Sequence, residues 1–452
     1  MSLPTSTHKG TVKPTPSAVF GPRNEQLLDI TLGNTETSLG VLHHFRDGST
    51  ECSRFTFDRG WLSSPRYFNV SPELRRHDQG QWRKPPGGRG SPFVAALADT
   101  QPDGFGRALI ERTLCDRVTP GHWLPHRESI DLVHLCAVHD FCRLGALRVR
   151  PQHAQPAATG RLIDLPTYVD LDPMLEAAAA FERGAADLRQ RMFLFYCASA
   201  LGGSRPKICF VQEDKTLAVA KFPSVLDEHP VTKAEMLGYE LAKAAGIKVA
   251  QAQLKNLRTG PVLIVQRFDR GGVGGRKHYL SAQSLLLAEE GEVLSCLDLI
   301  HCMRARCKDF VADARELWRR LMFKLLINSV EAELRKIGFL YVDRDRWRLA
   351  PAIDMTPGVK PRLPSTAAQI AELGPQFDVQ SLLGLSEAFA LPCAEASGVL
   401  IALVDAISRW RTVASQFAVG MKPDEIDRLE GVMNNKHFQQ AKDIVGALRT
   451  RA

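Results

Sequence analysis

Residues 200–270 place a glycine pair, two short apolar runs, a helix and a third apolar run in close succession. The apolar runs cover residues 207–212, 217–223 and 261–269, and their length and β-branched content predict strands. Between the second and third runs, apolar residues at helical spacing predict a helix over residues 233–245. The order strand, strand, helix, strand is typical of the small lobe of an α+β nucleotide-binding fold, although unrelated proteins share it.

The rest of the chain divides around this segment into predicted domains. Two strands are expected directly after residue 25, a helix over residues 315–329, a hairpin around residues 344–346 and several helices after residue 387. The predicted fold class is therefore α+β, with a small α/β domain first and a largely helical C-terminal part. The predicted limits are a flexible leader (1–24), an N-terminal domain (25–150) and a second domain (165–452), divided into a small lobe (about 165–275) and a helical lobe (about 276–452).

Composition excludes several classes of protein. The 452 residues are 44% hydrophobic and 24% charged, which excludes a wholly disordered chain, a collagen-like repeat and a disulfide miniprotein. A net charge of +8 is mild for this length, so a DNA-binding regulator is only a weak alternative, one that predicts affinity falling steeply with salt.

The cysteines bear on the compartment. The ten cysteines are scattered without a Cys-x-x-Cys pair, which indicates reduced thiols, and the polar N-terminus lacks an apolar signal region. Both features predict the cytoplasm, and no stretch is apolar enough to predict a membrane span. His301, Cys302 and Cys307 could suggest a metal site, but without a second pair of ligands the thiols are interpreted as buried side chains.

A glycine-rich turn followed by lysines is the chemically most informative local feature. Gly202 and Gly203 have no Cβ, so backbone amides can approach a phosphate group, and Lys207 adds positive charge. A Gly-Gly turn is also common as plain structure. Lys221 closes an apolar strand and needs a partner there, and a phosphate together with a carboxylate on the following helix would suit it. Glu235 and Glu240 are both candidates for that carboxylate.

Several short motifs occur in a fixed order along the chain. They are Gly60-Trp61-Leu62, Ser71-Pro72-Glu73-Leu74, Pro102-Asp103-Gly104-Phe105-Gly106-Arg107, Arg143-Leu144-Gly145-Ala146-Leu147, Gly202-Gly203-Ser204-Arg205-Pro206-Lys207, Lys221-Phe222-Pro223, Gln266-Arg267-Phe268-Asp269-Arg270, Gly338-Phe339-Leu340 and Leu349-Ala350-Pro351-Ala352-Ile353-Asp354-Met355. With these motifs, which cover about residues 25 to 420, the chain resembles the HipA family, the serine/threonine kinase toxins of bacterial toxin–antitoxin pairs.

The resemblance implies a HipA-like N-terminal domain followed by a two-lobed protein-kinase-like fold that uses ATP and Mg²⁺. It implies that Lys221 holds the α- and β-phosphates, next to the turn formed by Gly202, Gly203 and Ser204 with Lys207. Gln266 and Phe268 would lie against adenine, and Gln266 departs from the glutamate usual in the family. Asp269 would reach the ribose, and Asp354 would bind Mg²⁺.

The catalytic loop departs from the family pattern, Asn-Thr-Asp-x-His-x-x-Asn. Aligned on Gly338-Phe339-Leu340, the chain places Glu331 at the catalytic base, Glu333 at the histidine and Lys336 at the metal-binding asparagine. Glu331 moves the carboxylate by about one methylene, and a misplacement near 1 Å can cost roughly a hundredfold in rate. An ammonium group at position 336 cannot ligate a cation, unless it neutralises phosphate charge in place of a second metal.

The predicted function is therefore a cytoplasmic serine/threonine protein kinase that transfers the γ-phosphate of ATP to a protein hydroxyl. By resemblance, its substrate belongs to translation, for example an aminoacyl-tRNA synthetase, and a helix-turn-helix antitoxin is its partner and makes the DNA contacts. Ser199 or Ser204 is the candidate for autophosphorylation, although serine is also ordinary turn chemistry. The alternative is a pseudokinase that binds nucleotide or a partner without phosphotransfer.

Two other clusters of charged residues could also form sites. Arg267, Arg270 and Arg276 could form a basic patch for nucleic acid, but the resemblance explains the first two as part of the hinge. Glu73 and Asp103 could form a carboxylate pair for hydrolysis, but their separate motifs favour surface or turn roles.

Overall fold

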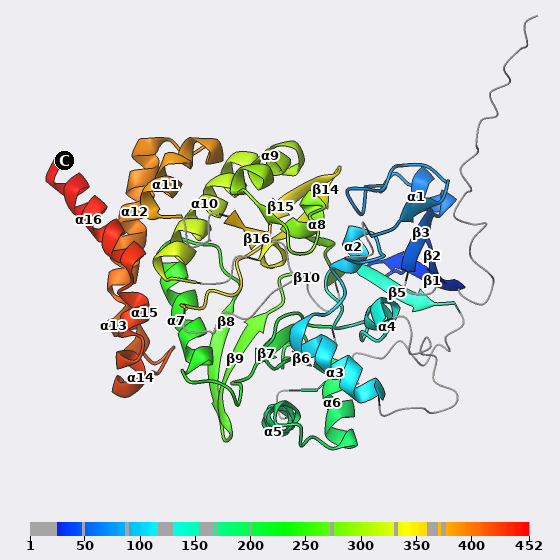
Figure 1. Ribbon diagram of the computed structural model, residues 1–452, viewed down its shortest axis with the longest axis horizontal. Helices are drawn as coiled ribbons and strands as arrows, with labels where there is room; N and C mark the ends of the chain where they lie inside the picture. Colours follow the sequence, from blue (N-terminus) through cyan, green and yellow to red (C-terminus); the bar gives the residue numbers. More distant parts are fainter. Residues whose placement is uncertain are drawn as a thin grey trace, which may run out of the picture.

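The structure is a computed structural model that describes most of the chain from residue 25 to residue 451 (Figure 1). The described residues are 25–47, 50–85, 90–115, 130–152, 166–167, 170–198, 200–271, 275–329, 333–358, 369–371 and 377–451. The predicted leader and most of the residues between the two predicted domains (151–164) lie outside these ranges, as do Ser199 and Glu331.

An antiparallel five-stranded sheet forms the N-terminal region, at the right of Figure 1. Leu28 and Ile30 are buried and alternate with more exposed neighbours, which is the pattern of a strand with one covered face. Helices α1 to α4 lie between β3 and β5 in the chain. The bounds are β1 (Glu25–Leu32), β2 (Thr37–Asp47), β3 (Thr50–Phe57), α1 (Arg59–Ser63), β4 (Gln81–Arg83), α2 (Ala95–Ala98), α3 (Gly104–Cys115), α4 (Ile130–Cys136) and β5 (Leu147–Pro151), and the strand order is β4-β3-β2-β1-β5.

A second antiparallel sheet, in the order β6-β7-β9-β8, forms the small lobe. Val262 and Ile264 of β9 belong to a core cluster shared with α3, α5 and α6, whereas Leu263 and Val265 belong to the cluster that includes α7. Because both faces are covered, this strand is a continuous apolar run. The bounds are α5 (Leu171–Glu182), α6 (Leu188–Ala198), β6 (Lys207–Val211), β7 (Leu217–Lys221), α7 (Val231–Ala244), β8 (Ala252–Leu257) and β9 (Gly260–Gln266).

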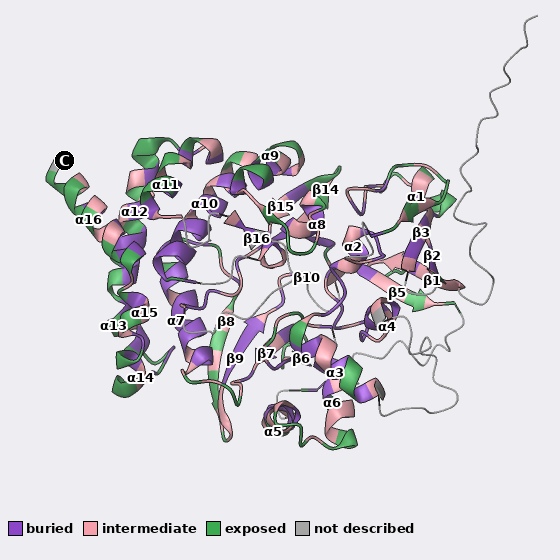
Figure 2. Cartoon of the chain, viewed as in Figure 1, coloured by how far each residue is buried: buried purple, intermediate pink, exposed green. Residues whose placement is uncertain are grey.

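The C-terminal part is largely helical and packs around α10. Trp318 and Phe323 of α10 are fully buried, and the Trp318 indole N–H donates to the carbonyl of Leu382 at 2.9 Å. Figure 2 shows α7 and α10 mostly buried, with α16 on the outside. The helices are α8 (Ala282–Leu286), α9 (Cys296–Arg306), α10 (Phe310–Leu326), α11 (Val379–Gly384), α12 (Cys393–Ser408), α13 (Trp410–Ser415), α14 (Pro423–Asp427), α15 (Glu430–Met433) and α16 (Lys436–Arg451), with 3₁₀ turns η7 (Leu334–Lys336) and η9 (Ser386–Phe389).

Short strands complete this part of the molecule. The predicted hairpin is present, because β14 pairs with β15 through a turn in which Arg344 and Asp345 both have positive φ. Among the described residues no helix combines the length and apolar character needed to cross a membrane. The strands are β10 (Arg270–Gly271), β11 (Gly275–Arg276), β12 (Tyr279–Ser281), β13 (Val293–Leu294), β14 (Gly338–Asp343), β15 (Arg346–Leu349) and β16 (Gln369–Ile370). The predicted α+β fold with a helical C-terminal part is confirmed.

Candidate nucleotide-binding site

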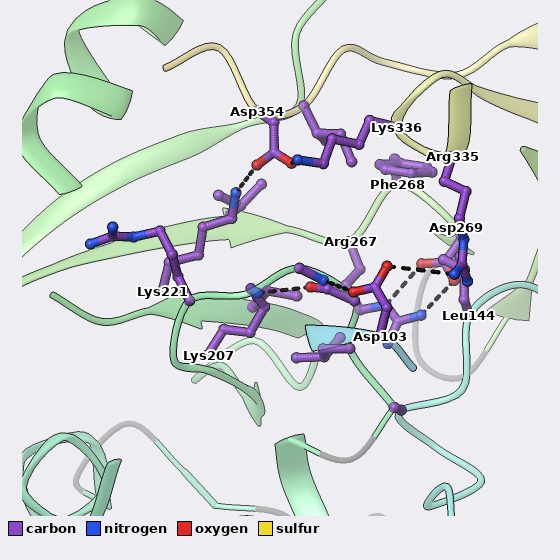
Figure 3. Close-up of a pocket in the computed structure, with 18 of the residues that line it drawn as sticks. Asp103, Leu144, Lys207, Lys221, Arg267, Phe268, Asp269, Arg335, Lys336 and Asp354 are labelled. Atoms are coloured by element: carbon purple, nitrogen blue, oxygen red, sulfur yellow. Dashed lines mark hydrogen bonds and ion pairs between the residues drawn. The ribbon is translucent and has the colours of Figure 1, made fainter. Parts of the chain in front are cut away.

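A cavity of about 220 Å³ lies between the four-stranded sheet and the helical part (Figure 3). Its lining comes from the turn before β6, the ends of β7 and β9, the segment around η7, and a piece of the N-terminal region. A concave site assembled from several parts of a chain is the usual form of a small-molecule site. The lining includes most of the predicted site residues, namely Gly202, Gly203, Ser204, Lys207, Lys221, Gln266, Phe268, Asp269 and Asp354.

Lys221, the last residue of β7, is paired as the sequence required. Its Nζ lies 2.6 Å from Oε1 of Glu235 on α7 and 2.5 Å from Oδ1 of Asp354. Burial alone would lower the pKa of Lys221, but the carboxylates of Asp354 and Glu235 outweigh it and hold the pKa well above its ordinary value. Of the two glutamates that the sequence offered as partners of Lys221, the structure therefore selects Glu235. The two carboxylates hold the ammonium group of Lys221 in place in the cavity.

The glycine-rich turn is held from two sides. Lys207 Nζ donates to the carbonyl of Gly202 at 2.7 Å, and the backbone N–H of Phe105 donates to the carbonyl of Gly203 at 3.0 Å. Gly203 has φ +90°, and a Cβ on the neighbouring Gly104 would lie 2.6 Å from the Gly203 backbone. Both glycines are therefore required, one by its own conformation and one by the close approach of two backbones.

A segment of the N-terminal region joins the two sides of the cavity. The carboxylate of Asp103 accepts from the backbone N–H of Gly203 and lies 3.5 Å from Nη1 of Arg335. Arg335 also donates to the carbonyl of Gln101 at 3.1 Å. The sequence assigned Asp103 to a surface or turn role, which is incomplete, because this residue connects the glycine-rich turn to the η7 segment. Glu73 instead accepts from the backbone N–H of Ala95 inside the N-terminal region.

Asp354 lies between two lysines. Its Oδ1 contacts Lys221, and its Oδ2 lies 3.6 Å from Nζ of Lys336, which is also 3.6 Å from Oε2 of Glu333 (Figure 3). The carboxylates of Asp354 and Glu333 are oxygen ligands of the kind that Mg²⁺ takes, but the ammonium group of Lys336 lies beside both of them. The ammonium group of Lys336 has no lone pair, so the residues do not fit a second ion at that position.

The predicted adenine-contacting residues lie at the end of β9. Gln266 is the last residue of β9, and its backbone N–H is already bonded to the carbonyl of Gln251 at 2.8 Å. Phe268 is partly buried and lies 6.0 Å from the ring of Tyr279, centroid to centroid. An aromatic pair beside the cavity offers an apolar surface on which a flat base can pack.

Asp269 lies in a buried ion-pair network. Its carboxylate accepts from Arg267 at 2.6 Å, from Arg270 at 2.6 Å and from the backbone N–H of Gly145 at 2.7 Å. Burial would raise its pKa, but the two arginines hold the pKa well below its usual range. The side chain of Asp269 is 2% exposed, so the carboxylate joins the N-terminal region to the small lobe. The contact with ribose stays a prediction, and the structure provides no support for it.

Other functional residues were not singled out by the sequence analysis. Arg335 and Tyr279 line the cavity, and so does Asp99, whose pKa is raised by burial. The sequence Pro102-Asp103-Gly104 indicates a turn, but it does not indicate that Asp103 contacts Gly203. None of these residues has a local pattern that distinguishes it from a surface charge or a core aromatic residue.

Fold and site together define a class of protein. A small antiparallel sheet carries a lysine paired with a helix glutamate, and a helical lobe supplies an aspartate to the same cavity. This is the arrangement of a protein-kinase-like nucleotide site.

Comparison with known proteins agrees. The profile of the HipA-like C-terminal domain matches residues 199–421. The protein named "Putative kinase Y4mE" of Sinorhizobium fredii is 26% identical over 243 residues, which span 47% of this chain and 54% of that protein. The match thus covers only about half of the relative's length. The chain therefore carries a HipA-like C-terminal domain, and its resemblance to the HipA family is confirmed.

Solved structures give the fold over a longer range. A chain from the Shewanella oneidensis MR-1 toxin–antitoxin complex of HipA, HipB and operator DNA superposes with a TM-score of 0.62 at 16% identity, covering 93% of this chain and 99% of that chain. The proinflammatory kinase CtkA of Helicobacter pylori gives a TM-score of 0.41 at 13% identity, over 55% of this chain and 93% of that chain. The first match confirms a HipA-like fold across both the N-terminal and C-terminal parts.

Proposed function

We propose that this chain is a bacterial HipA-like serine/threonine protein kinase, the toxin component of a toxin–antitoxin pair, which transfers the γ-phosphate of ATP to a protein hydroxyl. The observation that carries the proposal is the pairing of Lys221 with Glu235 and Asp354 inside the cavity. In protein kinases the equivalent lysine–glutamate pair must be formed for phosphoryl transfer.

The site residues receive the following roles in this proposal. Lys221 and Lys207 attract the phosphates, and the backbone of the turn from Gly202 to Ser204 approaches them. Gln266 and Phe268 pack against adenine. Asp354 holds Mg²⁺, which when bound neutralises phosphate charge. Glu331 accepts the proton of the attacking hydroxyl, and Ser199 or Ser204 is the site of autophosphorylation.

The partners are proposed from the family. We infer a helix-turn-helix antitoxin that carries the DNA contacts, and a protein substrate in translation such as an aminoacyl-tRNA synthetase. The Shewanella oneidensis protein was solved with HipB and operator DNA, which supports this kind of partner. A cytoplasmic location is supported by the cysteines, because nine of the ten are seen as free thiols.

Intact-mass measurement after incubation with ATP and Mg²⁺ tests the proposal. The parent should gain phosphate and Asp354→Asn should not. Ser199→Ala and Ser204→Ala compared side by side should show which serine carries it. If neither the chain nor any protein of a bacterial extract acquires label from γ-labelled ATP, phosphotransfer is refuted.

A pseudokinase is the second candidate, and the ion pair between Lys336 and Asp354 favours it. In that case the chain binds nucleotide and regulates a partner without phosphotransfer. The double variant Glu331→Asp with Lys336→Asn should then gain activity from an inert parent. Equal activity in the parent and the double variant would rule the pseudokinase out.

A further inference from the structure

We propose that the ammonium group of Lys336 takes the place of a divalent cation, so that the cavity binds a nucleoside triphosphate without Mg²⁺. This inference rests on the proposed nucleotide site and concerns binding rather than transfer. It is carried by the position of Lys336 relative to Asp354 and by the charges around them (Figure 3).

The first argument is position. Lys336 ends the η7 turn, and its side chain is only 16% exposed although lysine normally extends into water. Its ammonium group lies 3.6 Å from one oxygen of Asp354 and 3.6 Å from one oxygen of Glu333. These two carboxylates are the oxygen ligands that a cation would use, so the lysine already neutralises them.

The second argument is competition for Asp354. One of its oxygens is paired with Lys221 and the other with Lys336. A divalent ion that bound the second oxygen would lie within a few ångströms of the Lys336 ammonium group, and like charges at that distance repel. Lys336 and a divalent ion therefore compete for the same oxygen. Lys336 has the advantage, because it is part of the chain whereas the ion must bind from solution.

The third argument is the charge that a triphosphate brings. Three lysines line the cavity at this end, Lys207, Lys221 and Lys336. Lys221 is shared with two carboxylates, Glu235 and Asp354, so its single charge does not balance a triphosphate alone and a further cation is needed. The long, flexible side chain of Lys336 can contact phosphate oxygens while it stays near Asp354, which is the work that a bridging metal performs elsewhere.

Calorimetric titration of the full chain with ATP, in Mg²⁺ and in excess EDTA, tests the inference. The dissociation constants of the parent should agree within about threefold. Lys336→Asn should bind at least about tenfold more weakly in EDTA and regain most of the loss in Mg²⁺, whereas Lys336→Arg, which keeps the charge, should remain insensitive to metal. Lys243→Asn, an exposed lysine on α7, is the matched control and should behave like the parent.

Each outcome separates this inference from the proposed function. If the parent weakens more than about tenfold in EDTA, or if Lys336→Asn equals the parent there, the inference is overturned while the kinase proposal stands. If ATP binds equally with and without Mg²⁺ but no phosphate is transferred, the inference stands and the kinase proposal fails. Absence of binding under both conditions overturns both. Thermal unfolding of each variant shows whether it is folded. If Lys336→Asn does not fold, the comparison of the parent with Lys336→Arg in Mg²⁺ and in EDTA still tests the inference.

Discussion

The two walls of the cavity differ in how closely they follow the kinase arrangement. On the wall built by the small lobe, Lys221 and Glu235 are paired inside the cavity, and glycines form the turn next to them. On the wall built by the helical lobe, Asp354 is present but Lys336 stands where the family resemblance implies a metal-binding asparagine. The difference teaches that one wall of this cavity can keep the kinase arrangement while the other wall departs from it.

The N-terminal region supports both walls. Asp103 contacts the glycine-rich turn on one side and Arg335 on the other, and Gly145 donates to Asp269 at the end of the small-lobe sheet. The two walls are therefore positioned against a common third element. Variants in that element should change both walls together, whereas variants within one wall should separate them.

The largest effect is expected from Asp269→Ala, which tests whether the walls share one support. The substitution leaves Arg267 and Arg270 buried without their carboxylate, and breaking such a network costs about 3–5 kcal/mol. The free energy of unfolding, measured by urea denaturation, should fall by that amount. Asp78→Ala breaks an exposed pair with Arg59 and should cost less than about 1 kcal/mol. If the free energy of unfolding falls by similar amounts in both variants, Asp269 does not hold the N-terminal region against the small lobe.

Lys221→Met changes the small-lobe wall at its central cation and also removes the contact of Lys221 with Asp354 on the other wall. It removes the ammonium group proposed to hold phosphate, and it leaves Glu235, whose side chain is 3% exposed, without its cation. ATP affinity should fall about a hundredfold, which corresponds to roughly 2.7 kcal/mol. Titration calorimetry in Mg²⁺ measures this, with Lys243→Met as the control. A loss no larger than that of Lys336→Met would mean that Lys221 contributes no more to ATP binding than the lysine of the opposite wall.

Asp103→Ala sharpens the comparison, because its carboxylate touches both walls. Loss of the bonds to Gly203 and Arg335 should loosen the turn and weaken ATP binding by about tenfold. The corresponding free energy is close to that of one hydrogen bond to a charged group. Glu213→Ala, an exposed carboxylate on the β6–β7 turn, provides the comparison variant. Unchanged ATP affinity in Asp103→Ala would mean that the turn holds its shape without the N-terminal region.

Local patterns predicted the elements well where each element is determined by its own residues. The strands around 207–212, 217–223 and 261–269 were correct, since buried strands are continuous apolar runs. β8 (Ala252–Leu257) was missed, because as an edge strand it alternates between half-buried and exposed residues and has no apolar run.

Contacts between distant residues could not be predicted in the same way. The need for a carboxylate beside Lys221 follows from burial of a charge, so the partner was narrowed to two glutamates on one helix. Asp103 and Gly203 are separated by 100 positions, and Gly145 and Asp269 by 124, so no spacing rule joins them. For Asp269 the resemblance implied a ribose contact but gave no warning of the buried arginines that occupy its carboxylate.

The smallest expected effect concerns His278, which precedes Tyr279 of the cavity lining and donates to the carbonyl of Val70 at 2.8 Å. Burial lowers the pKa of His278 to about 4, because no water stabilises the imidazolium between Phe68 and Trp347. The unfolded chain binds this proton near pH 6.5 and the folded chain only near pH 4. The stability contributed by neutral His278 is therefore present above about pH 6.5 and is lost as the pH falls toward 4.

Urea denaturation at pH 7.5 and pH 5.5 measures this loss, which should be about 1 kcal/mol for one proton. His278→Gln keeps an N–H for Val70 but has no titrating group, so its stability should change less between the two pH values. His134, whose pKa is also lowered to about 4 by burial, continues to contribute in both proteins and cancels in the difference. Equal pH dependence of stability in the parent and the variant would mean that folding does not lower the pKa of His278. The contact between His278 and Val70 would then be insensitive to acid in this pH range.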